Sequence, residues 1–206
     1  MTVPDYWLQA CKQLSKRDPV IRKLIKTYPG ISLQSRGNAF QTLARAIVGQ
    51  QISVKAAESI WLRFLSTVKV VKPTNVLKAS PEDLRAVGLS FRKVEYLQDL
   101  ARHFQEKLIV EDEWPNQTDD EIIIDLVRVK GIGRWSAEMF LMFYLTRPDV
   151  FPIDDIGLQR AVQLHYNDGV PMTKAEILAI GETWRPWCSV ATWYLWRSLD
   201  PIPVEY

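Results

Sequence analysis

Residues 126–140 read LVRVKGIGRWSAEMF and place a glycine-containing turn between two helical segments. An amphipathic run ends near Lys130, and a new helix is expected to begin directly after Gly133. Gly131 and Gly133 permit backbone geometries with positive φ and keep side chains away from the turn. The N–H groups of residues 131–135 would then be exposed at a helix N-terminus, where the helix dipole favours a phosphate group. A plain helix–helix turn with a glycine C-cap accounts for the same pattern.

Helical patterns continue on both sides of this turn. Residues that cap helix N-termini precede apolar periodic runs at Asp18 (followed by Pro19), Asn38, Ser53, Ser80, Ser90, Thr118 and Thr173. The last long helical segment, 182–198, carries a series of tryptophans. The best candidate strand, VKVVKP at 68–73, is short and ends in proline, and residues 111–117 are the expected long connection. The sequence therefore predicts an all-α protein.

The composition of the chain excludes several classes of protein. Its 206 residues, 47% hydrophobic and 24% charged, are typical of a globular protein with a substantial core. The longest apolar run, 139–145, is far shorter than the ~20 residues of a membrane span, and the first ten residues show no signal pattern. Two cysteines and two histidines cannot supply a disulfide scaffold, a four-cysteine zinc site or an iron–sulfur cluster. A reducing intracellular setting is the simplest expectation.

Charge is distributed unevenly along the chain. The net charge is +2, but six of the 24 acidic residues fall within 111–121. The rest of the chain therefore carries a clear excess of basic over acidic residues. A moderately basic body with one acidic corner is typical of a protein that binds nucleic acid, although an ordinary mixed surface explains it equally well.

A second informative segment, VFPIDDIGLQRAV, occupies residues 150–162. An acidic pair, Asp154 and Asp155, follows an apolar, proline-containing approach and opens a helix. Capping of that helix is the ordinary role of such an aspartate. The acidic pair points to a function more strongly because it follows the glycine turn closely in the sequence.

Together these segments resemble the helix-hairpin-helix DNA glycosylase superfamily, and more closely its AlkA-type members, the type II DNA-3-methyladenine glycosylases. The resemblance rests on VKGIGRWSAEMF (129–140), FPIDD (151–155), ARAIVGQQISVKAA (44–57) and WRPWCSVATWYLW (184–196). It implies a single all-α domain over residues 1–206, with two helical lobes and a DNA-binding cleft. The middle lobe would span about 38–115, and the hairpin and catalytic segment 118–165.

The resemblance assigns the catalytic role to Asp155. In the superfamily the catalytic aspartate lies five residues before an arginine or similar residue, and Asp155 with Arg160 matches this spacing. Its ionised carboxylate would stabilise an oxocarbenium-like sugar and orient or deprotonate the attacking water. Asp154 would cap the helix or shape the local field.

A departure from part of the superfamily bears on the type of reaction. Bifunctional members carry a nucleophilic lysine two residues after the second hairpin glycine, where this chain has Trp135. Lys130 precedes the glycines and is in the wrong place for that role. Without a Schiff base there is no built-in strand cleavage, so the resemblance implies a monofunctional enzyme without AP-lyase activity. Its expected activity is hydrolytic release of alkylated purines, of the 3-methyladenine and 7-methylguanine type, in base excision repair.

Aromatic side chains would stack on the flipped, cationic base. By resemblance, Trp135 and Trp187 match pocket positions, Met139 stands where a close relative has tyrosine, and Phe40 is a further candidate. Core packing is the alternative for each aromatic residue. Core packing is also the expectation for three more tryptophans, Trp184, Trp193 and Trp196.

The remaining roles concern contacts with DNA and ions. The wedge that fills the gap left by the flipped base maps to Gln51, and Gln50 is expected to support the turn around it. By resemblance, the hairpin contacts DNA through Gly131, Gly133, Arg134 and Ser136. Main-chain carbonyls of Val127, Val129 and Ile132 would bind a structural monovalent cation, Na+ or K+, and no cofactor is required.

The expected partner is double-stranded DNA with damaged bases, without membrane contact, and the protein is expected to be a monomer. It would work in the cytoplasm or nucleoid of a bacterium or archaeon, or in a eukaryotic nucleus. Three alternatives remain: a glycosylase for uracil, hypoxanthine or oxidised bases, a non-catalytic helix-hairpin-helix DNA-binding protein, and a helical protein-interaction domain with no DNA role.

Overall fold

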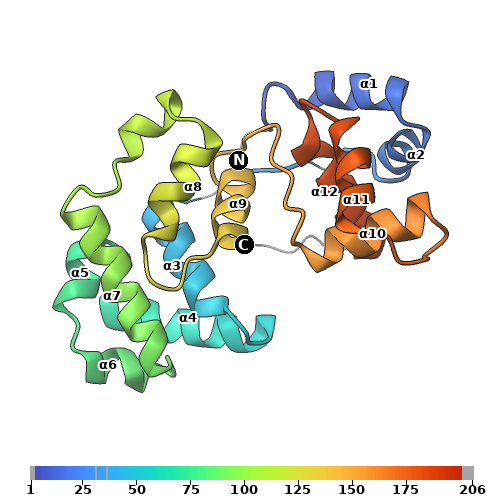
Figure 1. The fold of residues 1–206 in the computed structure, drawn as a ribbon. Coiled ribbons are helices and arrows are strands. Elements are labelled where there is room, and N and C mark those ends of the chain that lie inside the picture. Colours follow the sequence, from blue (N-terminus) through green and yellow to red (C-terminus); the bar gives the residue numbers. More distant parts are fainter. Residues whose placement is uncertain (1–2, 31, 36, 201–206) are drawn as a thin grey trace. The chain divides into compact units, whose positions relative to one another are not determined.

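The computed structural model describes residues 3–30, 32–35 and 37–200, and every regular element in these ranges is a helix (Figure 1). The all-α prediction is confirmed. The chain divides into a central unit, residues 37–140, and a terminal unit formed by the residues before 37 together with those from 141 onward. Within the described ranges, no helix is both long and apolar enough to cross a membrane.

The central unit holds the segments on both sides of the glycine turn. Its elements are α3 (Ala39–Gly49), α4 (Val54–Val68), α5 (Pro73–Lys78), α6 (Pro81–Ala86), α7 (Phe91–Gln105), a 3-10 helix η1 (Glu111–Asn116), α8 (Asp119–Val127) and the first part of α9 (Arg134–Phe143). Helix α7 packs against both α3 and α5. Leu43, Ile47, Phe64, Leu97 and Leu100 are buried in this core. Helix α7 is therefore the main support of the unit.

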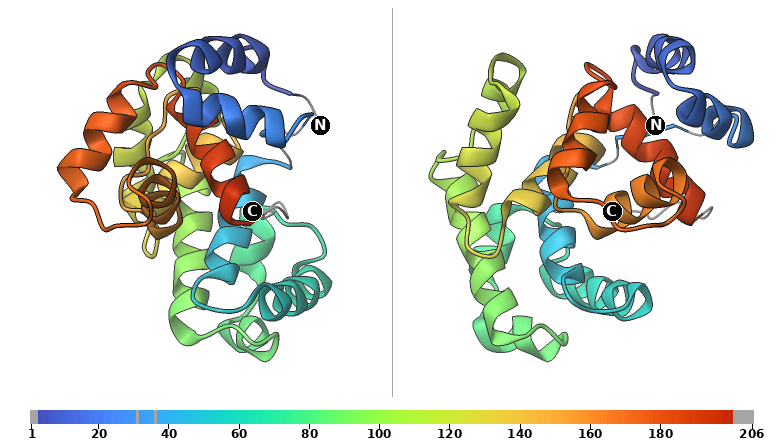
Figure 2. Two further views of the ribbon diagram at one scale, coloured as in Figure 1. Left: turned by 90° about the vertical axis from the view of Figure 1, so that its right-hand side faces the viewer. Right: turned by 45° about the vertical axis from the view of Figure 1, so that its right-hand side comes forward.

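The terminal unit is built around its last helix. Its elements are α1 (Trp7–Arg17), α2 (Pro19–Thr27), α10 (Ile156–Tyr166), α11 (Lys174–Glu182) and α12 (Cys188–Leu199). Helices α1 and α2 lie side by side (Figure 2), and α12 packs against α1, α2 and α10. Every residue from Cys188 to Leu195 is buried, which is typical of a helix at the centre of its unit.

The predicted helix caps are confirmed. Side-chain oxygens of Asp18, Asn38, Ser53, Ser80, Ser90, Thr118 and Thr173 accept hydrogen bonds from the first turns of their helices. Thr118 with Glu121, and Thr173 with Glu176, form complete capping boxes. Each such cap contributes about 1 kcal/mol to helix stability, so the sequence defines the helix starts locally.

The best candidate strand does not form: residues 69–72 connect α4 to α5, and the Asn75 side chain donates to the carbonyls of Val68 and Val70. Two other local predictions are wrong. Residues 111–116 form η1, whose Trp114 is buried against Phe140 with ring centroids 5.3 Å apart. The segment 182–198 is not one helix, since α11 ends at Glu182 and α12 begins only at Cys188, after Pro186.

Candidate functional site

Asp155 lies at the N-cap of α10, in the terminal unit. Its Oδ1 accepts hydrogen bonds from the Leu158 N–H, at 2.6 Å, and from Nε1 of Trp196, at 2.9 Å. The Trp196 ring stacks on Phe143 with centroids 5.9 Å apart and planes 9° from parallel. Asp155 therefore caps α10, and a distant aromatic side chain also orients its carboxylate, while its catalytic role stays a prediction.

Asp154 has a different environment from its neighbour. Its exposed carboxylate forms an ion pair with Lys174 at the start of α11. Arg160, whose spacing from Asp155 matched the superfamily, lies exposed on α10. Across the described residues, no three His, Cys, Asp or Glu side chains gather in a way that could hold a metal ion.

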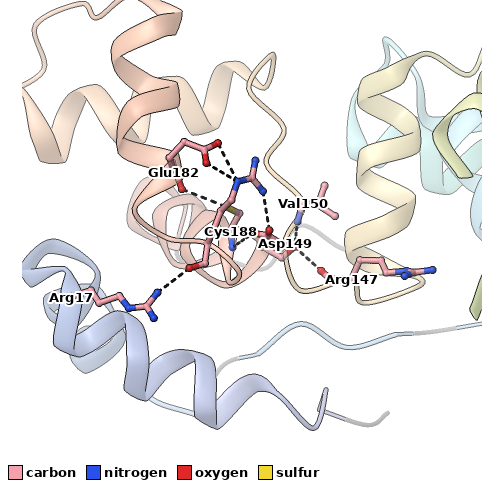
Figure 3. Close-up of polar contacts among 9 residues, drawn as sticks. Arg17, Arg147, Asp149, Val150, Glu182 and Cys188 are labelled. Carbon is pink, nitrogen blue, oxygen red and sulfur yellow. Dashed lines mark hydrogen bonds and ion pairs between the residues drawn. The ribbon is translucent and has the colours of Figure 1, made fainter. Parts of the chain in front are cut away.

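The loop that leads to Asp155 is fastened at its start to the first turn of α12 (Figure 3). Buried Ser189 donates through Oγ to the Arg147 carbonyl at 2.6 Å, and the same oxygen accepts from the Val150 N–H at 3.0 Å. Asp149 accepts from the Cys188 N–H at 3.3 Å and forms an ion pair with Arg185 at 2.8 Å. Backbone and side-chain bonds together fix residues 147–150.

The second half of the same loop is also held in place. The Phe151 ring meets Trp184 edge to face at 5.7 Å, and a Cβ added at Gly181 would lie 2.6 Å from that ring. The Asp155 N–H donates to the Pro152 carbonyl at 2.9 Å. Because Trp196 then binds Asp155 itself, α12 contacts both ends of the loop 147–155.

The tryptophans of 184–196 divide into different roles. Trp184 and Trp193 are buried, as predicted, and Trp184 donates through Nε1 to Asp18 at 3.0 Å. Trp187 is 9% exposed, stacks on Tyr6 with centroids 5.7 Å apart, and donates to Gln13 at 2.9 Å. Core packing is the wrong prediction for Trp196, which is only half-buried and donates through Nε1 to Asp155.

The glycine turn between α8 and α9 has the geometry that its sequence indicates. Gly131 has φ +82°, and a Cβ there would lie 2.1 Å from Cδ2 of Tyr96 on α7, so only glycine fits. A Cβ at Gly133 would meet open space. The Ile132 N–H donates to the Val129 carbonyl at 3.1 Å, which closes the turn. Val129 and Ile132 are buried, whereas Val127 is exposed.

The charged residues beside the turn are paired within the central unit. The Lys130 N–H donates to Asp99 at 2.9 Å, and its ammonium contacts Glu95, also on α7, at 2.5 Å. The hydrogen bond and the charge of Glu95 raise the pKa of Lys130. Arg134 contacts Glu138 and Asp120, and its side chain stays largely exposed.

The proposed pocket residues of the central unit have contrasting exposure. Trp135 on the first turn of α9 is 38% exposed, while Met139, one turn later on the same side, is buried. Ser136 is half-buried. Phe40 lies in the core, edge to face with Phe104 at 5.4 Å. The substrate contacts of these residues stay predictions.

The turn between α3 and α4 presents Gln51 to solvent with φ +58°. The side chain of Gln50 points back and donates through Nε2 to the Gly131 carbonyl at 2.8 Å. The structure thus brings the predicted wedge turn and the glycine hairpin together within the central unit. Asp155, Trp187 and Trp196 belong to the terminal unit, where Trp196 contacts Asp155 and Trp187 contacts Tyr6 and Gln13.

Known proteins are similar to this chain in both sequence and fold. Residues 44–186 match the model of the HhH-GPD superfamily of base excision DNA repair proteins. A Schizosaccharomyces pombe protein named DNA-3-methyladenine glycosylase 1 is 35% identical over 182 residues, which cover 85% of this chain and 79% of that protein. The chain spans 64% and 66% of the lengths of two Bacillus subtilis relatives.

Two solved structures resemble the chain over nearly its whole length. The crystal structure of a DNA-3-methyladenine glycosidase from Bacillus halodurans has a TM-score of 0.86 and 34% identity, and the match covers 93% of this chain and 89% of that one. The 3-methyladenine DNA glycosylase of Schizosaccharomyces pombe, in complex with abasic DNA, has a TM-score of 0.78 and 30% identity, with 95% and 100% covered.

Proposed function

Because the chain belongs to the HhH-GPD superfamily of base excision DNA repair proteins, we propose that it is a DNA glycosylase that releases alkylated purines from duplex DNA. The substrates are lesions of the 3-methyladenine and 7-methylguanine type. The observation that carries the proposal is the placement of Asp155 at the N-cap of α10, with its Oδ1 held by Leu158 and Trp196. The names of the similar proteins support the choice of lesion.

The chemistry is hydrolysis at C1′ of the damaged nucleotide. The bond between C1′ and the purine nitrogen breaks, and its electron pair leaves with the base, so a cationic lesion departs as a neutral molecule. The Asp155 carboxylate stabilises the positive charge that develops on the sugar. A water oxygen then bonds to C1′, and its proton passes to the carboxylate and on to solvent.

Binding of DNA is assigned to the central unit. The turn after Ile132 presents main-chain N–H groups at the start of α9, where a phosphate is favoured. Arg134 is exposed beside it. Gln51 fills the gap left by the flipped base, and Trp135 offers an indole face to a cationic purine, worth about 1–2 kcal/mol when desolvated. The protein acts as a monomer, in whichever compartment holds the DNA.

The enzyme is proposed to lack AP-lyase activity. The position of the lyase nucleophile holds Trp135, and Lys130 cannot replace it. Glu95 pairs with the Lys130 ammonium and raises its pKa, which keeps that nitrogen protonated and non-nucleophilic.

We further propose that the hairpin holds a structural monovalent cation and that catalysis needs no cofactor. The candidate carbonyls, those of Val127, Val129 and Ile132, lie within one short turn. A carbonyl oxygen has two lone pairs, so Val129 can accept the Ile132 N–H and also contact an ion. When bound, the ion supplies positive charge toward a DNA phosphate. Replacing Na+ and K+ by tetramethylammonium at constant ionic strength should weaken DNA binding, and unchanged binding would contradict the site.

The experiment that tests the proposed function measures bases released from methylated duplex DNA and identifies them by chromatography. The wild type should release 3-methyladenine or 7-methylguanine, and Asp155→Asn should be slower by about 100-fold or more. Asparagine can still cap α10, so this variant should fold. Asp154→Asn is the matched control and should stay active. Release of uracil, hypoxanthine or oxidised bases instead would reassign the substrate, and inactivity on all of them would contradict the enzyme.

A further inference from the structure

We propose that Lys93 and Gln50 are positioning residues, which hold the Gln51 turn against the glycine hairpin so that gap filling is coupled to phosphate binding. This inference rests on the proposed function, because it concerns how the same DNA interface works. Neither residue is suggested to touch the reacting atoms. Their contacts lie entirely within the central unit.

Lys93 clamps the backbone on both sides of Gly49. Its Nζ, on α7, donates to the Val48 carbonyl and to the Gln50 carbonyl, each at 2.8 Å. These carbonyls belong to the last turn of α3 and to its C-cap, where the helix itself supplies no N–H partners. The side chain is half-buried, and this burial lowers the pKa of Lys93. One ammonium group therefore fixes the path of the chain directly before Gln51.

The backbone at Gln51 needs such support. Its φ of +58° is in the left-handed region, which is uncommon for a residue with a Cβ. A conformation of this kind persists when the surrounding contacts determine it. The Gln51 side chain is exposed, so the geometry is imposed by the neighbouring residues, and it aims the side chain away from the core.

Gln50 connects the turn to the hairpin directly. Its Nε2 donates to the Gly131 carbonyl at 2.8 Å, across 81 residues of sequence. Gly131 is at the centre of the hairpin and lies against Tyr96. A movement of the hairpin on binding a phosphate is thus transmitted to the residue beside Gln51 through a single hydrogen bond.

Helix α7 supports both elements. Lys93, Tyr96 and Asp99 follow one another at a spacing of three residues, so each side chain lies next to the following one along the helix. Lys93 holds the turn, Tyr96 lies under Gly131, and Asp99 accepts from the Lys130 N–H at 2.9 Å. The wedge turn and the hairpin therefore share a single rigid base, which sets the distance between the inserted side chain and the bound phosphate.

The test compares the affinity for a duplex with an abasic-site analogue and for the same intact duplex. The wild type should prefer the abasic duplex, because Gln51 fills its gap. In Lys93→Met this preference should fall about tenfold, while affinity for intact DNA stays within about threefold, since the hairpin is retained. Gln51→Ala shows how far the preference for the abasic duplex falls when the wedge side chain itself is removed. Lys93→Arg should restore most of the preference, because a guanidinium can also donate to two carbonyls.

Matched controls separate positioning from general effects. Lys78→Met removes the same charge from an exposed site of the central unit and should change neither affinity. If Lys93→Met does not fold, Gln50→Ala carries the test, because it removes only the bond to Gly131, and Gln98→Ala is its control. An unchanged preference in the folded variants, or an equal loss of affinity for both duplexes, would overturn the inference. A wild type without any preference would contradict the proposed function itself.

Discussion

The indole Nε1 of Trp196 donates to Oδ1 of Asp155 over 2.9 Å, although 41 residues separate them in the chain. The same oxygen accepts the Leu158 N–H, so one carboxylate oxygen is oriented by a helix start and by a separate helix. Trp196 is itself fixed by stacking on Phe143. Two hydrogen bonds to the Asp155 carboxylate and the stacking of Trp196 on Phe143, all within the terminal unit, thus set the orientation of the proposed catalytic group.

Trp196→Phe keeps an aromatic ring and removes the N–H donor. We expect base release under single-turnover conditions to fall about tenfold or more, because the lost bond goes to a carboxylate, while DNA affinity is retained. Trp193→Phe is the comparison, since Trp193 is buried in the same helix and is not given a role in the reaction. Equal rates for wild type and Trp196→Phe would show that the hydrogen bond does not orient Asp155.

Gly157→Ala should separate stability from activity. Alanine in a helix is favoured over glycine by about 0.5–1 kcal/mol, and this gain offsets a weaker Asp155 cap of about 1 kcal/mol, so the melting temperature should change little. The added Cβ would lie 3.0 Å from Oδ1 of Asp155 and 3.5 Å from Nε1 of Trp196, so the carboxylate must shift by a few tenths of an ångström. Base release should therefore slow while the fold is retained. Thermal melting and single-turnover excision check this, and full activity would show that the carboxylate tolerates displacement.

Gly133→Asp should weaken binding to DNA without disturbing the hairpin. A side chain at this position meets open space, so the variant should fold. Its carboxylate would stand where the N–H groups at the start of α9 face a phosphate, and like charges repel. We expect affinity for duplex DNA to fall about tenfold, with Gly133→Asn as the uncharged control. Unchanged affinity of the aspartate variant would remove the hairpin from the DNA interface.

Borohydride should trap no covalent adduct between the protein and damaged DNA. The position of a lyase nucleophile holds an indole, and the Lys130 amine is paired with Glu95. A bifunctional glycosylase on the same DNA is the positive control. An adduct that disappears in Lys130→Ala would identify that amine as a nucleophile and make the enzyme bifunctional.

Asp99 should contribute to stability in a pH-dependent way. Burial acts to raise its pKa, but hydrogen bonds from the Lys130 N–H and Arg102, with the charges of His103 and Arg102, hold the pKa below its ordinary value. A depressed carboxyl pKa stabilises the folded state above the unfolded pKa of about 3.9 and loses this effect as the pH falls through the folded value. The difference in unfolding free energy between wild type and Asp99→Asn should shrink as the pH falls below about 4. Urea unfolding at several pH values below about 5 measures it, and a difference that grows as the pH falls below about 4 would contradict the sign.

Local features of the structure could be predicted from the sequence because they depend on neighbouring residues. Caps at Thr118 and Thr173 involve partners three residues away, and the turn at Gly131 needs the one residue that tolerates its φ. The supporting role of Gln50 was also predicted, as a residue of the turn around Gln51.

Features that depend on distant partners could not be read in the same way. Nothing near Trp196 in the sequence distinguishes it from the buried Trp193, because its partner Asp155 lies in another segment. The pattern EDEWPN at 111–116 looked like a loop from its charges, and the burial of Trp114 against Phe140 favours a 3-10 helix instead. The contact of Tyr96 with Gly131 likewise joins two segments that no periodicity connects.

The two contacts that α12 makes with the loop 147–155 also restrict where residues can be inserted into or deleted from the sequence. Ser189 and Trp196 are seven residues apart, close to two full turns, so they face the same side of the helix. One residue inserted or deleted between them would rotate Trp196 by about 100° relative to Ser189, and the loop could no longer satisfy both. This segment of α12 therefore has a fixed register, and insertions and deletions should accumulate elsewhere, as in the exposed turn 167–172 that links α10 and α11.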